Sequence, residues 1–145
     1  MKFSAVGFTK NEIKFILDVL GNKKAWDASF SYSSTPSKEL VIIKTPGADI
    51  DKTFGAQKYL HGLSVCDRTK APTIIYFRKE NWDSIPVTSG YNDLALYRVY
   101  LILHEFGHAI GYDHAKCPGA GQPAPVMMQQ TLGTGKCYPD PWVVK

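Results

Sequence analysis

Residues 94–114 read LALYRVYLILHEFGHAIGYDH and decide how this chain folds. Apolar and histidine side chains recur in this stretch at steps of three and four, the spacing of one face of an α-helix. They are Leu94, Tyr97, Leu101, His104 and His108. We expect Asn92 or Asp93 to cap the helix, because either side chain can accept a hydrogen bond from a free N–H of the first turn. The histidines continue the apolar face, so the helix should pack under a sheet with its last two turns in a cleft.

The second half of the stretch matches HExxHxxGxxH at every fixed position. His104 and His108 are four residues apart, so they lie one turn above each other and can both face one metal ion. Gly111 can leave the right-handed helical region without a Cβ penalty, which would let the chain turn and bring in His114 as a third ligand. Glu105 stands beside the first ligand and is the expected general base for a zinc-bound water. The pattern therefore predicts one catalytic zinc ion with an open coordination position.

A less specific interpretation is that two histidines on a core-facing helix pair with a nearby glutamate. With 4 His and 12 Gly among 145 residues, a chance match to every fixed position is expected in roughly one of 10^5 such chains. The fixed offsets of Gly111 and His114 would also have no role in that interpretation. We therefore favour the metal site.

Length and composition indicate a single globular domain over residues 1–145. The chain is 44% hydrophobic and 21% charged, which argues against disorder. Its net charge of +4 comes from scattered Lys and Arg residues, so we expect a solvated surface and no nucleic-acid partner. No apolar run approaches the roughly 20 residues that span a bilayer, and the first residues contain no signal-peptide apolar region. We expect a monomer without a membrane partner.

The segments before the metal motif predict a helix followed by a sheet, and so a mixed α/β (α+β) fold. Thr9 and Glu12 have the spacing of a capping box, and apolar residues follow at helical spacing until Gly21. Four segments rich in β-branched and aromatic residues are expected as strands of one twisted sheet. They are 30–32, 40–43, 59–66 and 73–77, with 59–66 as the candidate edge strand. We expect His61, in that segment, to be solvent-facing or satisfied at a turn.

The tail from Lys116 onward is rich in proline and glycine and is predicted to be an irregular subdomain. Cys117 and Cys137 bracket much of it, and a disulfide between them would contribute about 3 kcal/mol. Such a bond requires oxidising surroundings, as for a secreted or extracytoplasmic protein. Cys66 would then be an unpaired, buried small apolar residue. The alternative for Cys66 is a thiolate at the open position of the zinc.

Together these residues resemble the metzincin clan of zinc metalloproteases. That clan joins HExxHxxGxxH to a downstream turn whose methionine supports the three histidines from beneath. Val126-Met127-Met128-Gln129 is the corresponding segment, with Met127 as the first choice and Met128 as the second. The alternative is that both methionines are flexible fillers of a core. The resemblance implies a twisted mixed sheet with an antiparallel edge strand above the cleft, an N-terminal helix and an active-site helix.

Residues 97–142 also resemble an actinobacterial metzincin-like family of unassigned function, through the segments 117–131 (CPGAGQPAPVMMQQT) and 137–142 (CYPDPW). Two departures from other metzincins stand out. Gln129 and Gln130 occupy positions where some metzincins have a tyrosine, and the chain ends too soon for a long C-terminal helix. No tyrosine role can therefore be carried over, and the disulfide is expected to fix the short tail.

The expected function is that of a zinc-dependent endopeptidase, with Glu105 as the base and a peptide or protein as the substrate. The peptide would bind by adding to the edge strand of the sheet. Two alternatives stay open. One is an inactive zinc-bearing binding or toxin-like module, and the other is a zinc hydrolase of a non-peptide amide.

Overall fold

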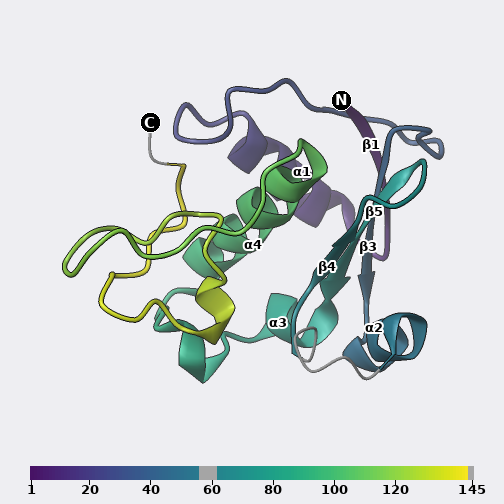
Figure 1. Ribbon diagram of the computed structural model, residues 1–145. Helices are drawn as coiled ribbons and strands as arrows, with labels where there is room; N and C mark the ends of the chain where they lie inside the picture. Colours follow the sequence, from purple (N-terminus) through teal and green to yellow (C-terminus); the bar gives the residue numbers. More distant parts are fainter. Residues whose placement is uncertain (56–61, 144–145) are drawn as a thin grey trace.

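In the computed structural model, which describes residues 1–55 and 62–143, five strands form one mixed sheet in the order β2-β1-β3-β5-β4 (Figure 1). The strands are β1 (Lys2–Val6), β2 (Ser31–Tyr32), β3 (Leu40–Thr45), β4 (Val65–Asp67) and β5 (Thr73–Arg78). All neighbouring pairs are parallel except β4 and β5, which are antiparallel. The predicted α/β class with a twisted mixed sheet is confirmed.

The two longest helices in the described chain, α1 (Lys10–Leu20) and α4 (Leu94–Ala109), pack against each other beside the sheet (Figure 1). Their buried faces meet apolar residues of the central strands to form one core. Phe106 of α4, for example, contacts Phe3 of β1 edge-to-face, with ring centroids 5.4 Å apart. The core therefore holds α4 in place along its whole buried face. The shorter helices are α2 (Gly47–Phe54), α3 (Lys79–Asp83), η2 (Val87–Ser89) and η3 (Gln130–Leu132).

The sheet has one strand more than the four segments expected, because Lys2–Val6 forms β1, between β2 and β3. This segment is short and contains Ser4 and Ala5, so its composition carries little strand signal. Its place in the sheet comes from pairing with Ser31–Tyr32 on one side and Leu40–Thr45 on the other. Lys2–Val6 is therefore a strand because of pairing with distant segments, which a local sequence pattern does not indicate.

The predicted edge strand is confirmed in part. The expected range 59–66 includes residues 59–61, which lie outside the described residues, as does the expectation for His61. Within the described chain the strand begins later, at Val65, and ends at Asp67. It is the antiparallel edge strand of the sheet, as expected.

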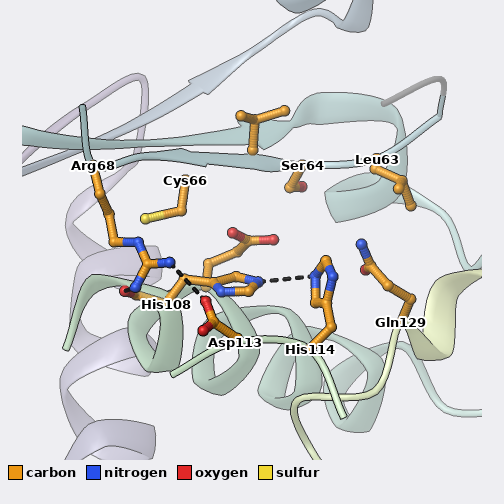
Figure 2. A pocket seen from close by; sticks show the side chains of 10 residues that line it. Leu63, Ser64, Cys66, Arg68, His108, Asp113, His114 and Gln129 are labelled. Carbon is orange, nitrogen blue, oxygen red and sulfur yellow. Dashed lines mark hydrogen bonds and ion pairs between the residues drawn. The ribbon is translucent and has the colours of Figure 1, made fainter. Parts of the chain in front are cut away.

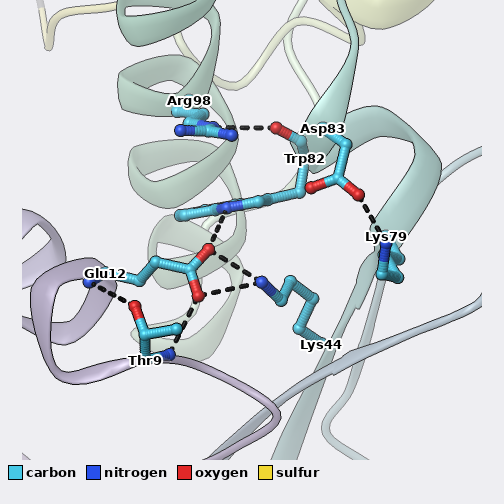
Figure 3. A network of polar contacts seen from close by, with 7 residues as sticks. All are labelled: Thr9, Glu12, Lys44, Lys79, Trp82, Asp83 and Arg98. Carbon is cyan, nitrogen blue, oxygen red and sulfur yellow. Dashed lines mark hydrogen bonds and ion pairs between the residues drawn. The ribbon is translucent and has the colours of Figure 1, made fainter.

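The capping box at the start of α1 is confirmed and extends into a partly buried network (Figure 3). The carboxylate of Glu12 accepts hydrogen bonds from Thr9 N (2.9 Å), Lys44 Nζ (2.7 Å) and Trp82 Nε1 (2.6 Å). Arg98 of α4 lies over the Trp82 ring and donates to its backbone oxygen. One carboxylate thus joins α1, β3, α3 and, through Trp82, α4.

We expect Glu12→Ala to lower the free energy of unfolding by about 2–4 kcal/mol at pH 7, because it leaves Lys44 half-buried without its carboxylate and Trp82 Nε1 without an acceptor. Burial alone would raise the pKa of Glu12, but hydrogen bonds from Lys44 and Thr9 and the charge of Lys44 outweigh it and lower the pKa. A lowered folded-state pKa means that this stabilisation is full above pH 4.5, the ordinary value, and is lost as the pH falls through the folded-state pKa.

Urea denaturation at pH 7 and at pH 3 measures both effects. Asp18→Ala is the matched control, because Asp18 pairs with Lys14 on the exposed face of the same helix and should change stability little. An equal loss for the two variants at pH 7 would contradict the role given to Glu12.

The tail is irregular apart from a short turn, as predicted, and the disulfide between Cys117 and Cys137 is confirmed. The buried side chain of Gln130 organises the tail: its Nε2 donates to the backbone oxygens of Pro125 (2.9 Å) and Asp140 (2.8 Å), and its Oε1 accepts from the hydroxyl of Tyr91 (2.7 Å). A disulfide is compatible with an extracytoplasmic location. Among the described residues, no helix has the length and apolar character needed to cross a bilayer.

Candidate metal centre

The helix α4 begins at one of the two residues predicted to cap it and is followed by the predicted reversal. Asp93 is the N-cap, and its side chain accepts a hydrogen bond from Leu96 N at 3.1 Å. After the helix ends, Gly111 adopts φ +107°, a conformation that a residue with a Cβ rarely takes. The reversal carries the chain back, so that His114 Nε2 lies 3.0 Å from His108 Nε2.

The three predicted ligands come together. One ring nitrogen from each of His104, His108 and His114 lies within 4.8 Å of the other two, a group that could hold a metal ion. His104 and His108 are presented by consecutive turns of α4, and His114 arrives from the reversed segment that follows. The spacing of the motif is thus realised in three dimensions.

Backbone carbonyls fix the orientation of two of these rings. His104 Nδ1 lies 2.7 Å from Val126 O, and His108 Nδ1 lies 2.8 Å from Tyr112 O. A carbonyl oxygen only accepts, so each Nδ1 carries the hydrogen and each neutral ring presents an Nε2 lone pair to the centre. His104 Nε2 is buried without a partner among the described residues, and a bound cation would satisfy it. The residues present therefore fit a metal ion.

The histidines are held in the neutral form that binds metals. Burial, followed by the neighbouring histidines, lowers the pKa of His104 to about 3. Burial is also the largest cause that lowers the pKa of His108 and of His114. All three rings are consequently uncharged at neutral pH, so a cation need not displace protons from them.

Glu105 is almost completely buried, with 4% of its surface exposed. Its Oε2 has no hydrogen-bond partner among the described residues. Burial raises the pKa of Glu105 to about 8. A carboxyl group in this position can take up or release a proton near neutral pH, which is the property required of a general base.

Val126 and Met127 support the histidines from the tail. Val126 O receives the His104 hydrogen bond, and Met127 O accepts from the backbone N–H of Ala115, the residue after His114. Met127 is buried, and its Sδ lies 2.5 Å from the position that a Cβ on Gly107 would occupy. Met128 instead receives the hydroxyl of Tyr100 on its carbonyl oxygen. Met127, the first choice from the sequence, is thus the methionine packed against α4 at Gly107.

A cleft of about 480 Å³ opens beside the histidines (Figure 2). One wall is the segment that includes the edge strand β4, and the other is α4 with the reversed segment and the tail. Its lining residues are Leu63, Ser64, Val65, Cys66, Arg68, Glu105, His108, Asp113, His114 and Gln129. The predicted cleft at the last turns of α4 is therefore present, with Glu105 inside it.

A comparison with protein families matches residues 3–138 to the family described as "Protein of unknown function (DUF3152)". The chain belongs to the DUF3152 family. The match contains the sheet except for Lys2, and it includes the three histidines, Glu105 and both disulfide cysteines. No curated protein and no solved structure matches the chain in the corresponding comparisons.

Cys66 of this DUF3152 chain lines the cleft together with His108 and His114. It is unpaired and half-buried, and burial and the charge of Glu105 raise its pKa to about 12. It is therefore a neutral thiol at physiological pH. The group of possible metal ligands found among the described residues consists of the three histidines alone. Cys66 forms part of the cleft wall, so the expectation of a small buried residue holds only in part.

Two further residues at this centre were missed from the sequence. Trp26 donates its Nε1 hydrogen to Leu103 O of α4 (2.7 Å), and its ring stacks on Tyr112, with centroids 4.5 Å apart. Tyr112 is the residue whose carbonyl oxygen orients His108. Arg68 donates to His108 O and pairs with Asp113, which ties the end of β4 to the reversed segment. Both residues act across long sequence separations, which a local motif does not reveal.

We expect Gly107→Ala to destabilise the protein by about 1–3 kcal/mol and to weaken metal binding. In an open helix the change would stabilise by about 0.5–1 kcal/mol, because alanine restricts the unfolded chain. Here the added Cβ would lie 2.7 Å from Trp26 Cζ2 as well as 2.5 Å from Met127 Sδ. The indole is held by its hydrogen bond to Leu103 O and its stack on Tyr112, so it cannot move aside cheaply. The cost of overpacking therefore outweighs the better helix propensity of alanine. Trp26 and Met127, which support the histidines, must both shift.

Urea denaturation and zinc titration calorimetry test this. Gly119→Ala is the control, because a Cβ there would meet only Gln122 Cγ, at 3.9 Å. If Gly107→Ala matched Gly119→Ala in both measurements, the close packing at Gly107 would contribute neither to stability nor to zinc affinity.

Proposed function

We propose that this protein is a zinc-dependent endopeptidase of the metzincin type. The observation that carries the proposal is the convergence of three neutral imidazole nitrogens beside the buried Glu105, in a cleft bordered by an edge strand. The motif and the downstream methionine, which resemble those of the metzincin clan, support the same conclusion.

The ligand set favours zinc over other divalent ions. Imidazole nitrogens suit zinc, whereas magnesium and calcium prefer oxygen ligands. A structural zinc site is normally closed by four protein ligands, whereas catalytic sites keep three and an open position. When bound, zinc would polarise a substrate carbonyl and acidify an adjacent water.

Glu105 would supply the proton transfers. Its buried carboxyl faces the cleft, so its Oε2 can accept a proton from the attacking water and return it to the leaving nitrogen. The carbonyls of Val126 and Tyr112 hold His104 and His108 in their ligating orientation. Burial of His104 and Glu105 also excludes bulk water from the base of the site and strengthens local electrostatic interactions.

A peptide in extended conformation is the proposed substrate. Strand β4 pairs with β5 along one edge, and its other edge pairs with no strand among the described residues. The segment containing β4 also lines the cleft. A substrate strand could therefore bond to this edge while its scissile carbonyl lies at the metal, with alternate side chains entering the cleft. We further propose an extracytoplasmic location, from the disulfide, and a monomeric state.

Incubation of the zinc-loaded protein with a diverse peptide library, with and without a chelator, tests the function. The proposal expects internal cleavages that the chelator abolishes and that added zinc restores. Zinc-loaded protein that cleaves no peptide would contradict it, and would direct attention to an inactive binding module or to a hydrolase of non-peptide amides. Chelator-resistant cleavage would point to a contaminating protease of another class.

A further inference from the structure

Two adjacent glutamines in the tail have opposite environments. Gln130 is fully buried, and both its amide oxygen and its amide nitrogen are hydrogen-bonded, to Tyr91, Pro125 and Asp140. Gln129 is half-buried and lines the cleft with Glu105 and His114. Figure 2 shows its side chain beside His114, rising from the tail toward the wall at Leu63. No hydrogen bond of the Gln129 amide occurs with any described residue. Gln130 thus holds the fold, whereas Gln129 presents free N–H groups to the cleft.

The other polar groups of the cleft are less suited to act as neutral donors. Arg68 is already bonded to His108 O and to Asp113. Ser64, on the wall that includes β4, accepts the backbone N–H of Arg78 on its Oγ, which restrains the hydroxyl but leaves its O–H free. The Cys66 thiol is a weak donor. A peptide carbonyl that becomes tetrahedral gains negative charge on its oxygen, which an oriented N–H donor stabilises. Among the described side chains that line the cleft, Gln129 is the uncommitted amide that could supply this donor.

We propose that Gln129 is a catalytic residue whose side-chain amide donates a hydrogen bond to the substrate carbonyl oxygen as negative charge develops on it. This inference rests on the proposed peptidase function and deepens it. Glu105 reaches the cleft from α4 and would transfer protons. Gln129 reaches the cleft from the tail and would only donate a hydrogen bond. Because the amide can rotate, either of its two N–H groups can donate to the substrate carbonyl oxygen once the substrate is bound. The interaction would be stronger in the transition state than with bound substrate.

The experiment compares Gln129→Ala and the near-isosteric Gln129→Glu, which removes both donors, with Gln122→Ala, an exposed glutamine of the same tail. The expected loss in kcat is about 10- to 100-fold for Gln129→Ala, with KM little changed. Gln129→Glu should lose more, because its carboxylate repels the developing charge. Affinity for a peptide phosphonate, which mimics the tetrahedral state, should fall by the factor lost in kcat/KM. Zinc affinity and Tm should be unchanged, which separates this role from a structural one.

Wild-type kcat and phosphonate affinity in Gln129→Ala would overturn the inference while leaving the peptidase proposal intact. A parallel fall in Tm or zinc affinity would also overturn it, because Gln129 would then support the fold. Wild-type protein that cleaves no peptide would overturn both proposals together.

Discussion

Glu105→Ala in the zinc-loaded protein is expected to abolish measurable peptide hydrolysis while zinc stays bound. Loss of a positioned general base costs about 10²- to 10⁴-fold in rate. Glu105 contributes no ligand atom to the three-histidine group, so zinc binding should persist. Chelator-sensitive peptide cleavage gives the rate, and elemental analysis of the same sample gives the zinc content.

Glu105→Gln is the matched variant for this test. It keeps the volume of a side chain that is 4% exposed and removes its ability to accept a proton as a base. Loss of activity in both variants, with normal folding and zinc content, would assign the effect to proton transfer. A turnover rate equal to wild type in either variant would remove Glu105 from the proposed mechanism.

His114→Ala has the second large expected effect, which falls on metal retention. His114 is the one member of the three-histidine group outside α4, and it reaches the group through the reversal at Gly111. Loss of a residue that only orients a ligand costs about 10- to 100-fold in metal affinity. Loss of a ligand itself should therefore cost more than about 100-fold, measured by competition with a chromogenic zinc chelator.

Asp113→Ala is the control for this measurement. Asp113 precedes His114, is largely exposed and pairs with Arg68 at the surface, so its loss should affect zinc affinity far less. Retention of full zinc affinity by His114→Ala would exclude His114 from the ligand set. The site would then have two ligands on one helix.

The parts of the site that the sequence predicted are those determined by local geometry. The spacing of His104 and His108 follows from the pitch of a helix, and the positive φ of Gly111 from the need to reverse the chain. Asp93 and the Thr9 capping box act within a single turn. Each of these features involves residues close in sequence, so the pattern alone could predict them.

The parts that the sequence missed depend on contacts between distant segments. β1 is a strand because two other strands flank it, and its own residues do not predict this position. Trp26 reaches α4 across 77 residues. Cys66 and Gln129 face the cleft because of the register of an edge strand and the path of an irregular tail. Registers and tail paths are set by tertiary packing, which overrides local propensity.

The most direct test of the central claim is anomalous diffraction at the zinc absorption edge from crystals grown with zinc. We expect one strong anomalous peak at about 2.0–2.1 Å from the Nε2 atoms of His104, His108 and His114, with an open coordination position facing the cleft. A peak elsewhere, or three rings that do not converge on it, would contradict a three-histidine zinc site.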